Sequence, residues 1–341
     1  MRKTLRLSAS VVICALVGCL SACQSAPVPQ PKSVQAREHI VSDRAYEEIA
    51  HSTLDALEAA DKDAKADSLT ARVGEPARGQ RAAQYQLQGL RDGFQPPAYT
   101  IGVDAKDAKP VSSGTAFPRS LLSYSAPVEG QNQRTLTAWQ QADARSNYKL
   151  WGQVVLFPQE DLPELVSTLS DEEGFVQADA GKYVADPSQV AQGYAAYLNE
   201  RKVGEIKFKE GDAFYKKITE HIDALKQTVG DHGSVALKAA PSDMKPVLVA
   251  TKDQGIVLMQ ELVYDIVYTS TDEDQLLTLK DSNEALMYSK DKAKSSVDIA
   301  KDQPFTAHYS ILLAFHVPAK GGADTVNLIG ASTNVLLSAS A

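Results

Sequence analysis

The chain has 341 residues and is acidic, since 43 aspartates and glutamates against 35 lysines and arginines give a net charge of −8. An acidic chain without a block of basic residues lacks the electrostatic footprint of a nucleic-acid-binding protein, so we expect no nucleic-acid partner. The length exceeds what one typical hydrophobic core fills, which predicts two domains.

Residues 1–22 have the order of charge and hydropathy that is typical of an export signal peptide. Three basic residues stand within the first six positions, and an apolar run follows over residues 7–20. This run is shorter than the roughly 20 apolar residues that a transmembrane helix needs. An N-terminal membrane helix that stays uncleaved is the alternative interpretation.

The sequence LSAC at residues 20–23 resembles the lipobox of bacterial lipoproteins. The resemblance implies cleavage after Ala22 and acylation of Cys23, which becomes the first residue of the mature chain. The expected location is the cell membrane, on its extracytoplasmic face, with the lipid on Cys23 as the anchor. An ordinary secreted protein, in which Cys23 has no such role, is the alternative. Both other cysteines lie before residue 22, so we expect no disulfide within the mature chain.

Residues 23–40 contain three closely spaced prolines and few residues that could pack in a core. Such a segment favours extended conformations at roughly 3.1 Å per residue. We therefore expect a proline-rich tether between the membrane anchor and the folded part of the chain.

The first predicted domain, residues 41–158, begins with helices and ends with strands. Apolar residues at helical spacing predict helices over residues 44–65 and 75–93. Short runs rich in β-branched and aromatic residues, separated by turn residues, then predict an antiparallel sheet. Its expected strands are residues 99–103, 116–127, 134–143 and 147–158.

The second predicted domain, residues 187–341, repeats this order after an acidic junction over residues 159–186. Its expected helices are residues 187–202 and 212–233, with Asp212 as N-cap and Gly230 near the end of the second. Its expected strands are residues 233–240, 245–251, 255–271, 304–319 and 324–340.

Helices followed by strands in both halves predict an α+β fold with antiparallel sheets. Helices against a strongly bent antiparallel sheet resemble the cone-shaped fold of nuclear transport factor 2 and its relatives (NTF2-like). Together, the lipobox and four further segments resemble a family of actinobacterial lipoproteins of uncharacterised function. These segments are RAAQYQL at 81–87, NYKLWGQVVLFP at 147–158, AFHVPAKGG at 314–322 and VNLIGASTNVLLSAS at 326–340. That family has no established catalytic residues, so the resemblance implies none here.

Two acids on one predicted strand are the strongest candidates for chemistry. Glu261 and Asp265 share a strand face, but four residues along a strand span about 13 Å, beyond the roughly 5 to 9.5 Å of glycosidase carboxylate pairs. Either acid alone, or His308, is a candidate general base. We expect these groups at the mouth of one cone-like pocket. The predicted lining is Tyr264, Tyr268, His308, Tyr309, Glu261 and Asp265.

The sequence favours binding over catalysis. The six histidines show no metal-ligand spacing, and no glycine-rich phosphate loop occurs, so we expect no metal and no cofactor. We expect a surface lipoprotein that acts as a binding or scaffolding module for an envelope protein or a small apolar ligand. The alternatives are a solute-binding lipoprotein of an importer, and an extracytoplasmic enzyme with a single carboxylate or histidine in one cone.

Overall fold

A computed structural model describes residues 41–112, 117–126, 134–166, 181–271 and 276–341. The predicted signal peptide, Ala22, Cys23 and the tether lie outside these residues, as does the middle of the 159–186 segment. Residues 37–341 form one compact unit. None of the helices in the described ranges is both long and apolar enough to cross a membrane.

Several of the helices begin at a side chain that accepts a hydrogen bond from a backbone N–H group of the first turn. Ser42, Asp212 and Ser282 each accept a hydrogen bond from the backbone N–H three residues further on. The four long predicted helices are confirmed, whereas α3 and α6 were not predicted. The helices are α1 (Asp43–Asp63), α2 (Ala77–Leu90), α3 (Ala105–Ala108), α4 (Val190–Glu200), α5 (Ala213–Val229) and α6 (Asn283–Ser289), with short 3-10 helices at Ala66–Ala71 and Gly230–His232.

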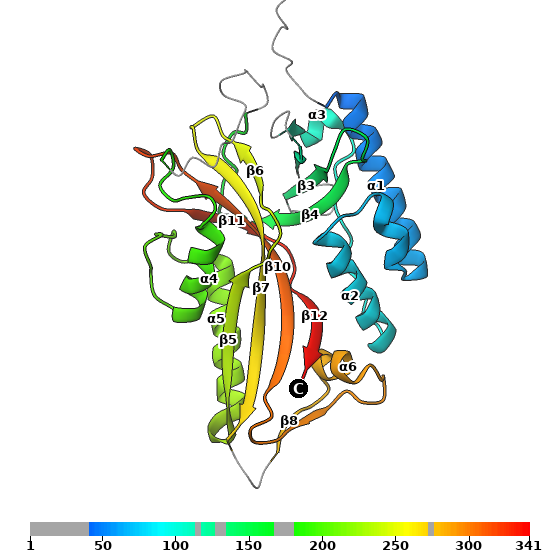
Figure 1. Cartoon of the computed structure of the whole chain (residues 1–341), viewed down its shortest axis with the longest axis vertical. Helices are drawn as coiled ribbons and strands as arrows, with labels where there is room; N and C mark the ends of the chain where they lie inside the picture. The colour runs from blue at the N-terminus through cyan, green and yellow to red at the C-terminus, as the bar shows by residue number, and fades with distance from the viewer. Residues whose placement is uncertain (1–40, 113–116, 127–133, 167–180, 272–275) are drawn as a thin grey trace, which may run out of the picture. The chain divides into compact units, whose positions relative to one another are not determined.

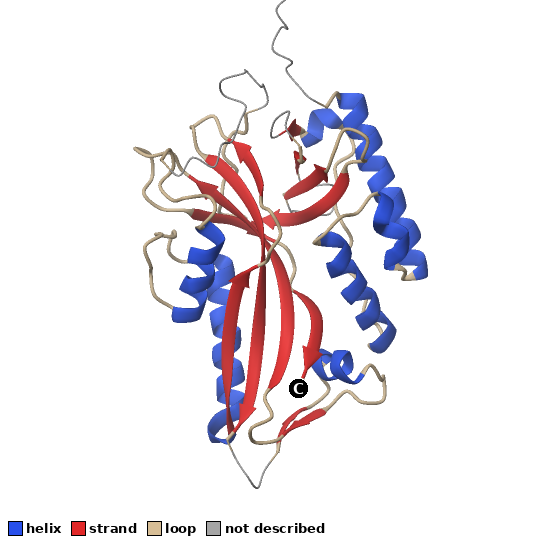
Figure 2. Ribbon diagram, in the orientation of Figure 1, coloured by secondary structure: helices blue, strands red, loops and turns tan. Residues whose placement is uncertain are grey.

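The strands pair in antiparallel ladders throughout the described residues, so the α+β class is confirmed (Figure 2). The strands are β1 (Val111–Ser112), β2 (Arg119–Ser125), β3 (Thr135–Gln141), β4 (Lys149–Leu156), β5 (Gly233–Pro241), β6 (Val247–Ala250), β7 (Ile256–Ser270), β8 (Leu277–Leu279), β9 (Val297–Ile299), β10 (Phe305–Val317), β11 (Asn327–Ala331) and β12 (Val335–Ser340).

The two long strands β7 and β10 form the centre of a ten-stranded sheet (Figure 1). On the other edge of β7, β6 and β5 pair with different parts of the strand. On the other edge of β10, β11 and β12 likewise divide the strand between them. The sheet order is β1-β2-β3-β4-β11-β10-β7-β5, with β6 and β12 beside this path and β8 and β9 as a separate pair.

The predicted division into domains at 41–158 and 187–341 is not confirmed, and neither is an NTF2-like cone in each half. β4 of the first half pairs with β11 of the second through Gly330 opposite Leu156 and Ala331 opposite Val155. One sheet therefore runs through both halves. Apolar patterns identify each strand, but they do not show which strand edges will pair.

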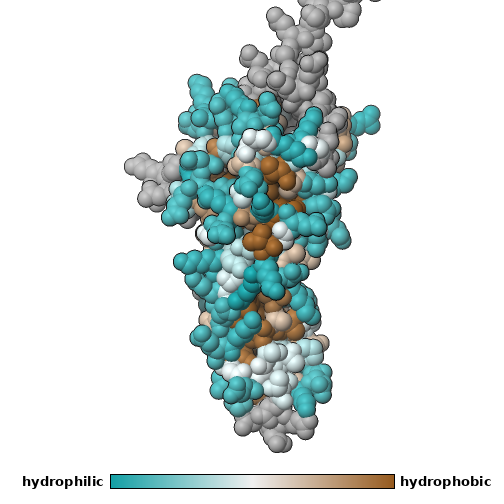
Figure 3. All heavy atoms as spheres, turned by 90° about the vertical axis from the view of Figure 1, so that its left-hand side faces the viewer, coloured by the Kyte–Doolittle hydropathy of each residue, from teal (hydrophilic) through white to brown (hydrophobic). Residues whose placement is uncertain are grey.

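Side chains from both halves also share a core. One buried cluster joins Trp151 of β4 to Met259 of β7 and Leu312 of β10. α4 and α5 bury their apolar faces, including Tyr194 and Ile222, against β5, β7 and β10. On the side that carries these two helices, apolar residues reach the surface in separate patches among hydrophilic ones (Figure 3).

A second core lies under α1 and α2. Tyr46 of α1 meets Trp139 of β3 edge to face, with ring centroids 5.9 Å apart. Trp139 also donates its indole N–H to the Thr53 hydroxyl at 3.2 Å. Burial raises the pKa of Tyr46 to about 12, so its hydroxyl stays protonated and donates to the carbonyl of Gly102.

The prediction of a strand over residues 99–103 is wrong. Its backbone groups bind side chains instead of a neighbouring strand, since the Thr100 N–H donates to Gln153 Oε1 at 3.0 Å. In the same way, the Gly102 N–H donates to Ser125 Oγ at 2.9 Å. These hydrogen bonds to side chains satisfy the backbone N–H groups of Thr100 and Gly102, so the segment does not need to pair with a strand.

Candidate functional site

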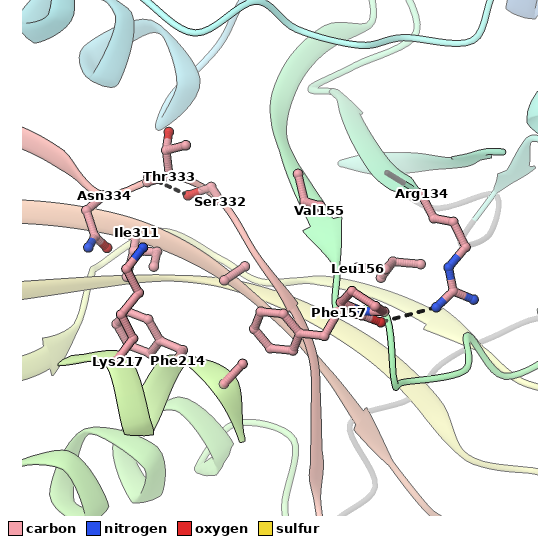
Figure 4. A pocket seen from close by; sticks show the side chains of 13 residues that line it. Arg134, Val155, Leu156, Phe157, Phe214, Lys217, Ile311, Ser332, Thr333 and Asn334 are labelled. Carbon is pink, nitrogen blue, oxygen red and sulfur yellow. Dashed lines mark hydrogen bonds between the residues drawn. The ribbon is translucent and has the colours of Figure 1, made fainter. Parts of the chain in front are cut away.

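A cavity of about 540 Å³ opens where strands from the two halves meet (Figure 4). It is bounded by the end of β4, the first turn of α5, the middle of β10 and the turn between β11 and β12. Its lining consists of residues 134, 155–158, 213, 214, 217, 311 and 331–334. The cavity lies at the end of β4, which has two register pairs with β11.

The walls of the cavity are apolar. Val155 and Leu156 are the last residues of β4, and Phe157 follows them. Phe214 at the start of α5 and Ile311 of β10 contribute the opposite side, where both are buried. Such a lining favours a ligand with an apolar body.

The turn at residues 332–334 supplies polar groups at one end. Ser332 is fixed to β10 at Leu312: its N–H donates to the Leu312 carbonyl at 2.8 Å, and its hydroxyl accepts from the Leu312 N–H at 2.9 Å. Thr333 and Asn334 follow and are exposed. In Figure 4 these two side chains lie on the same side of the cavity as Lys217, with Arg134 on the opposite side.

The charged lining of the cavity is entirely basic, although the chain as a whole is acidic. Arg134 donates to the carbonyls of Phe157 at 3.1 Å and Glu160 at 2.6 Å, and its guanidinium lies 3.9 Å from the Asp161 carboxylate. Lys217 is exposed, and its ammonium makes neither an ion pair nor a hydrogen bond within the described parts of the chain. The Arg134 guanidinium therefore stabilises the fold, whereas the Lys217 ammonium is available to bind a ligand.

Asp212 positions α5 beside the cavity. Its Oδ1 accepts from the Tyr215 N–H at 2.7 Å and from the Tyr194 hydroxyl at 2.8 Å. Burial raises the pKa of Asp212, and burial together with this carboxylate raises the pKa of Tyr194 well above its ordinary value. This buried pair fixes the first turn of the helix, and with it Phe214 and Lys217.

Two further cavities, of about 490 and 630 Å³, lie beside α1 and differ from the first in the charge of their lining. The smaller has both Lys106 and Glu164 in its lining. The larger contains the ion pair of Arg81 and Asp61. In both, acids and bases neutralise each other, so the cavity at β4 and α5 is the one of the three with an uncompensated charge.

Of the three tyrosines predicted as pocket lining, Tyr264 and Tyr268 are buried in the core and Tyr309 is partly buried against it. Tyr264 and Tyr309 stack with ring centroids 5.1 Å apart, and the Tyr309 hydroxyl donates to Glu284 of α6 at 2.6 Å. Tyr268 is buried beside Phe305. Burial raises the pKa of all three hydroxyls, and the Glu284 carboxylate adds to this effect.

The predicted acids and His308 lie on the opposite face of the sheet, because alternate residues of a strand point to opposite faces. Asp265 Oδ1 lies 2.8 Å from His308 Nδ1, and His308 Nε2 lies 3.2 Å from the hydroxyl of Ser340. Glu261 instead accepts from the Ser310 hydroxyl at 2.5 Å. The acids thus have separate partners.

The prediction that these six residues line one pocket is therefore corrected. The strand alternation that places Glu261 and Asp265 together also turns the tyrosines away from them. None of the six lines the cavity at β4 and α5. Across the described ranges, no three histidine, cysteine or acidic side chains gather as a metal site.

Sequence reasoning missed the cavity because its lining comes from five separate segments of both halves. One signal was present: the polar residues 332–334 interrupt two apolar runs that were predicted as a single strand over 324–340. This interruption is the turn at which β11 ends and β12 begins.

Compared with protein-family models, curated proteins and solved structures, the chain shows no match in any of the three.

Proposed function

We propose that this protein is a lipid-anchored surface module that binds a small apolar ligand in the cavity between β4, β10 and α5. The observation that carries the proposal is the cavity itself, whose volume of about 540 Å³ and apolar walls are typical of ligand pockets. Acylation of Cys23 would hold the protein at the extracytoplasmic face of the membrane, and residues 23–40 would separate the binding unit from the bilayer.

The neutral dye Nile red tests the binding proposal on the compact unit, residues 37–341. We expect saturable binding of one dye per chain, measured as enhanced fluorescence. The substitution Ala213→Trp fills the cavity from an exposed position at the start of α5, and should abolish this signal. Ala59→Trp, at an exposed position of α1, is the matched control and should bind as the wild type does.

Absence of dye binding to the wild type would overturn the proposal. Equal binding by the wild type and the Ala213→Trp variant would also overturn it, because the dye would then occupy another surface. Far-UV circular dichroism of each variant checks that the fold is retained.

The second candidate function is acyl transfer to water, and one specific observation favours it. Asp265, His308 and Ser340 form a hydrogen-bonded series on three adjacent strands, in the order carboxylate, imidazole, hydroxyl. In such a series the serine Oγ attacks an ester carbonyl while His308 Nε2 takes the hydroxyl proton, and the carboxylate orients the imidazole. The proton then passes to the leaving alkoxide, and water releases the acyl group.

Hydrolysis of p-nitrophenyl acetate tests this second candidate. An enzyme should release p-nitrophenolate faster than buffer does, and both Ser340→Ala and His308→Gln should remove the excess rate. Ser338→Ala, at a neighbouring exposed position of β12, should leave it unchanged. A rate of p-nitrophenolate release equal to that in buffer would overturn this second candidate function.

A further inference from the structure

We infer that the cavity between β4, β10 and α5 selects an acidic amphiphile, a molecule with an apolar body and one carboxylate or phosphate head group, and that Lys217 binds the head group. This inference rests on the proposed function and adds the class of ligand. Its basis is the contrast between an acidic chain and a cavity whose charged lining is basic.

The arrangement of the lining gives the ligand an orientation. The apolar side chains of Val155, Leu156 and Phe157 lie together on the β4 side. Lys217 and Asn334 lie at the other side of the cavity, as Figure 4 shows. An apolar body against β4 would therefore place a head group beside Lys217.

The two cations of the lining have different roles. Arg134 donates hydrogen bonds to two backbone carbonyls, at 3.1 and 2.6 Å, and lies beside the Asp161 carboxylate. Lys217 has no such partner in the described parts of the chain, and three ammonium donors are free for an anion. The charge that a ligand would meet is therefore that of Lys217.

The side chains around Lys217 would support an anion. Thr333 and Asn334 are exposed at the same end, and their hydroxyl and amide groups can donate hydrogen bonds to oxygen atoms. A hydrogen bond to a charged group is stronger than one between neutral groups. Because Lys217 is exposed, we expect an effect of about tenfold in affinity at low salt, decreasing as salt is added.

The test compares four probes of equal chain length on residues 37–341 by isothermal titration calorimetry. Decanoate and decyl phosphate carry the two head groups, 1-decanol is the neutral probe, and decylammonium has the opposite charge. We expect both anions to bind about tenfold more tightly than the alcohol, and decylammonium to bind least. The stronger of the two anions indicates whether the natural ligand is a carboxylic acid or a phosphate ester.

Two adjacent lysines provide a matched pair of variants. Lys217→Met should reduce the affinity for the anions about tenfold and leave the affinity for 1-decanol unchanged. Lys216→Met removes the same charge from the preceding residue of α5, which is exposed and does not line the cavity. This variant should bind all four probes as the wild type does.

The outcomes separate this inference from the proposed function. Equal affinity for decanol and the anions, or equal loss of affinity in both lysine variants, would overturn the inference and leave the binding function standing. Failure of every probe, 1-decanol included, to bind the wild type would overturn both. Anion binding that survives in the Ala213→Trp variant would also overturn the inference, since the site would lie elsewhere.

Discussion

Arg81 is buried in α2, and the carboxylate of Asp61 balances its charge. The guanidinium side chain is 1 % exposed and donates to both Asp61 oxygens, at 2.9 and 2.8 Å. The Tyr85 hydroxyl donates to the same carboxylate at 2.5 Å, and burial, reinforced by Asp61, raises the pKa of that hydroxyl. The contact joins α2 to the end of α1, so it is structural and leaves no charge for a ligand.

We expect Asp61→Asn to lower the free energy of unfolding by about 2 kcal/mol. Loss of one partner of a fully buried ion pair costs roughly 3 to 5 kcal/mol, but the Asp61 side chain is 38 % exposed, so water moderates the loss. Urea denaturation followed by circular dichroism measures the change. Asp55→Asn, at an exposed position of the same helix, is the control and should stay within about 0.5 kcal/mol of the wild type. Equal stability of both variants would contradict the prediction.

His316 makes the stability of the fold dependent on pH. Burial lowers the pKa of this imidazole, and the carboxylate of Asp253, 3.2 Å from Nε2, opposes the shift in part. Because the folded-state pKa lies below the roughly 6.5 of an unfolded histidine, the unfolded chain takes up this proton first. The stability contributed by neutral His316 is therefore present above about pH 6.5 and is lost as the pH falls through the folded-state value.

The substitution His316→Gln should reduce this loss. We expect the urea midpoint of the variant to fall less than that of the wild type between pH 7 and pH 5. His221→Gln replaces an exposed histidine of α5 and should follow the wild type. A His316→Gln variant whose midpoint falls as steeply as that of the wild type would refute the assignment.

At the scale of elements, close contact between β4 and β10 depends on a glycine. A Cβ atom at Gly152 of β4 would clash with Cδ1 of Leu312 on β10. Both residues belong to the segments that build the core shared by the two halves. The absence of a side chain at Gly152 thus lets the first-half strand lie against the central strand.

Gly152→Ala should destabilise the protein by about 1 to 3 kcal/mol through overpacking, with the free energy of unfolding as the measurement. Leu312→Ala in the same chain would remove the clashing atom, so the double variant should be less destabilised than the sum of the two single variants. Gly89→Ala of α2 is the control, because a Cβ atom added there would meet nothing within 4 Å and alanine favours a helix. Strict additivity of the Gly152 and Leu312 changes would count against the proposed contact.

At the scale of the whole molecule, the continuous sheet predicts that the two halves unfold together. Both tryptophans, Trp139 and Trp151, belong to strands of the first half, so their fluorescence reports on that half and, through Trp151, on the core that it shares with the second half. The circular dichroism signal also includes α4 and α5 of the second half. We expect the two signals to give coincident urea transitions for residues 37–341. Separated transitions would instead support two independent domains divided at residues 159–186.

The elements themselves were predictable because their signals are local. Ser42, Asp212 and Ser282 all begin helices by bonds to groups three residues away, and the first two introduce helices that the spacing of apolar residues predicts. The segment at 99–103 was predicted as a strand because its composition is typical of one. Its actual partners, Gln153 and Ser125, are distant in sequence, so no local pattern could reveal them.

The sequence by itself determined the α+β class, the acidic charge, the four long helices, the strands β7 and β10, and the strand alternation that puts Glu261 and Asp265 on one face. Only the tertiary structure decided that β4 joins β11, that a cavity forms beside this junction, and that Lys217 faces it without a partner among the described residues. The reason is physical: periodicity records which face of each element is buried, whereas edge pairing and cavities depend on contacts between residues more than a hundred positions apart.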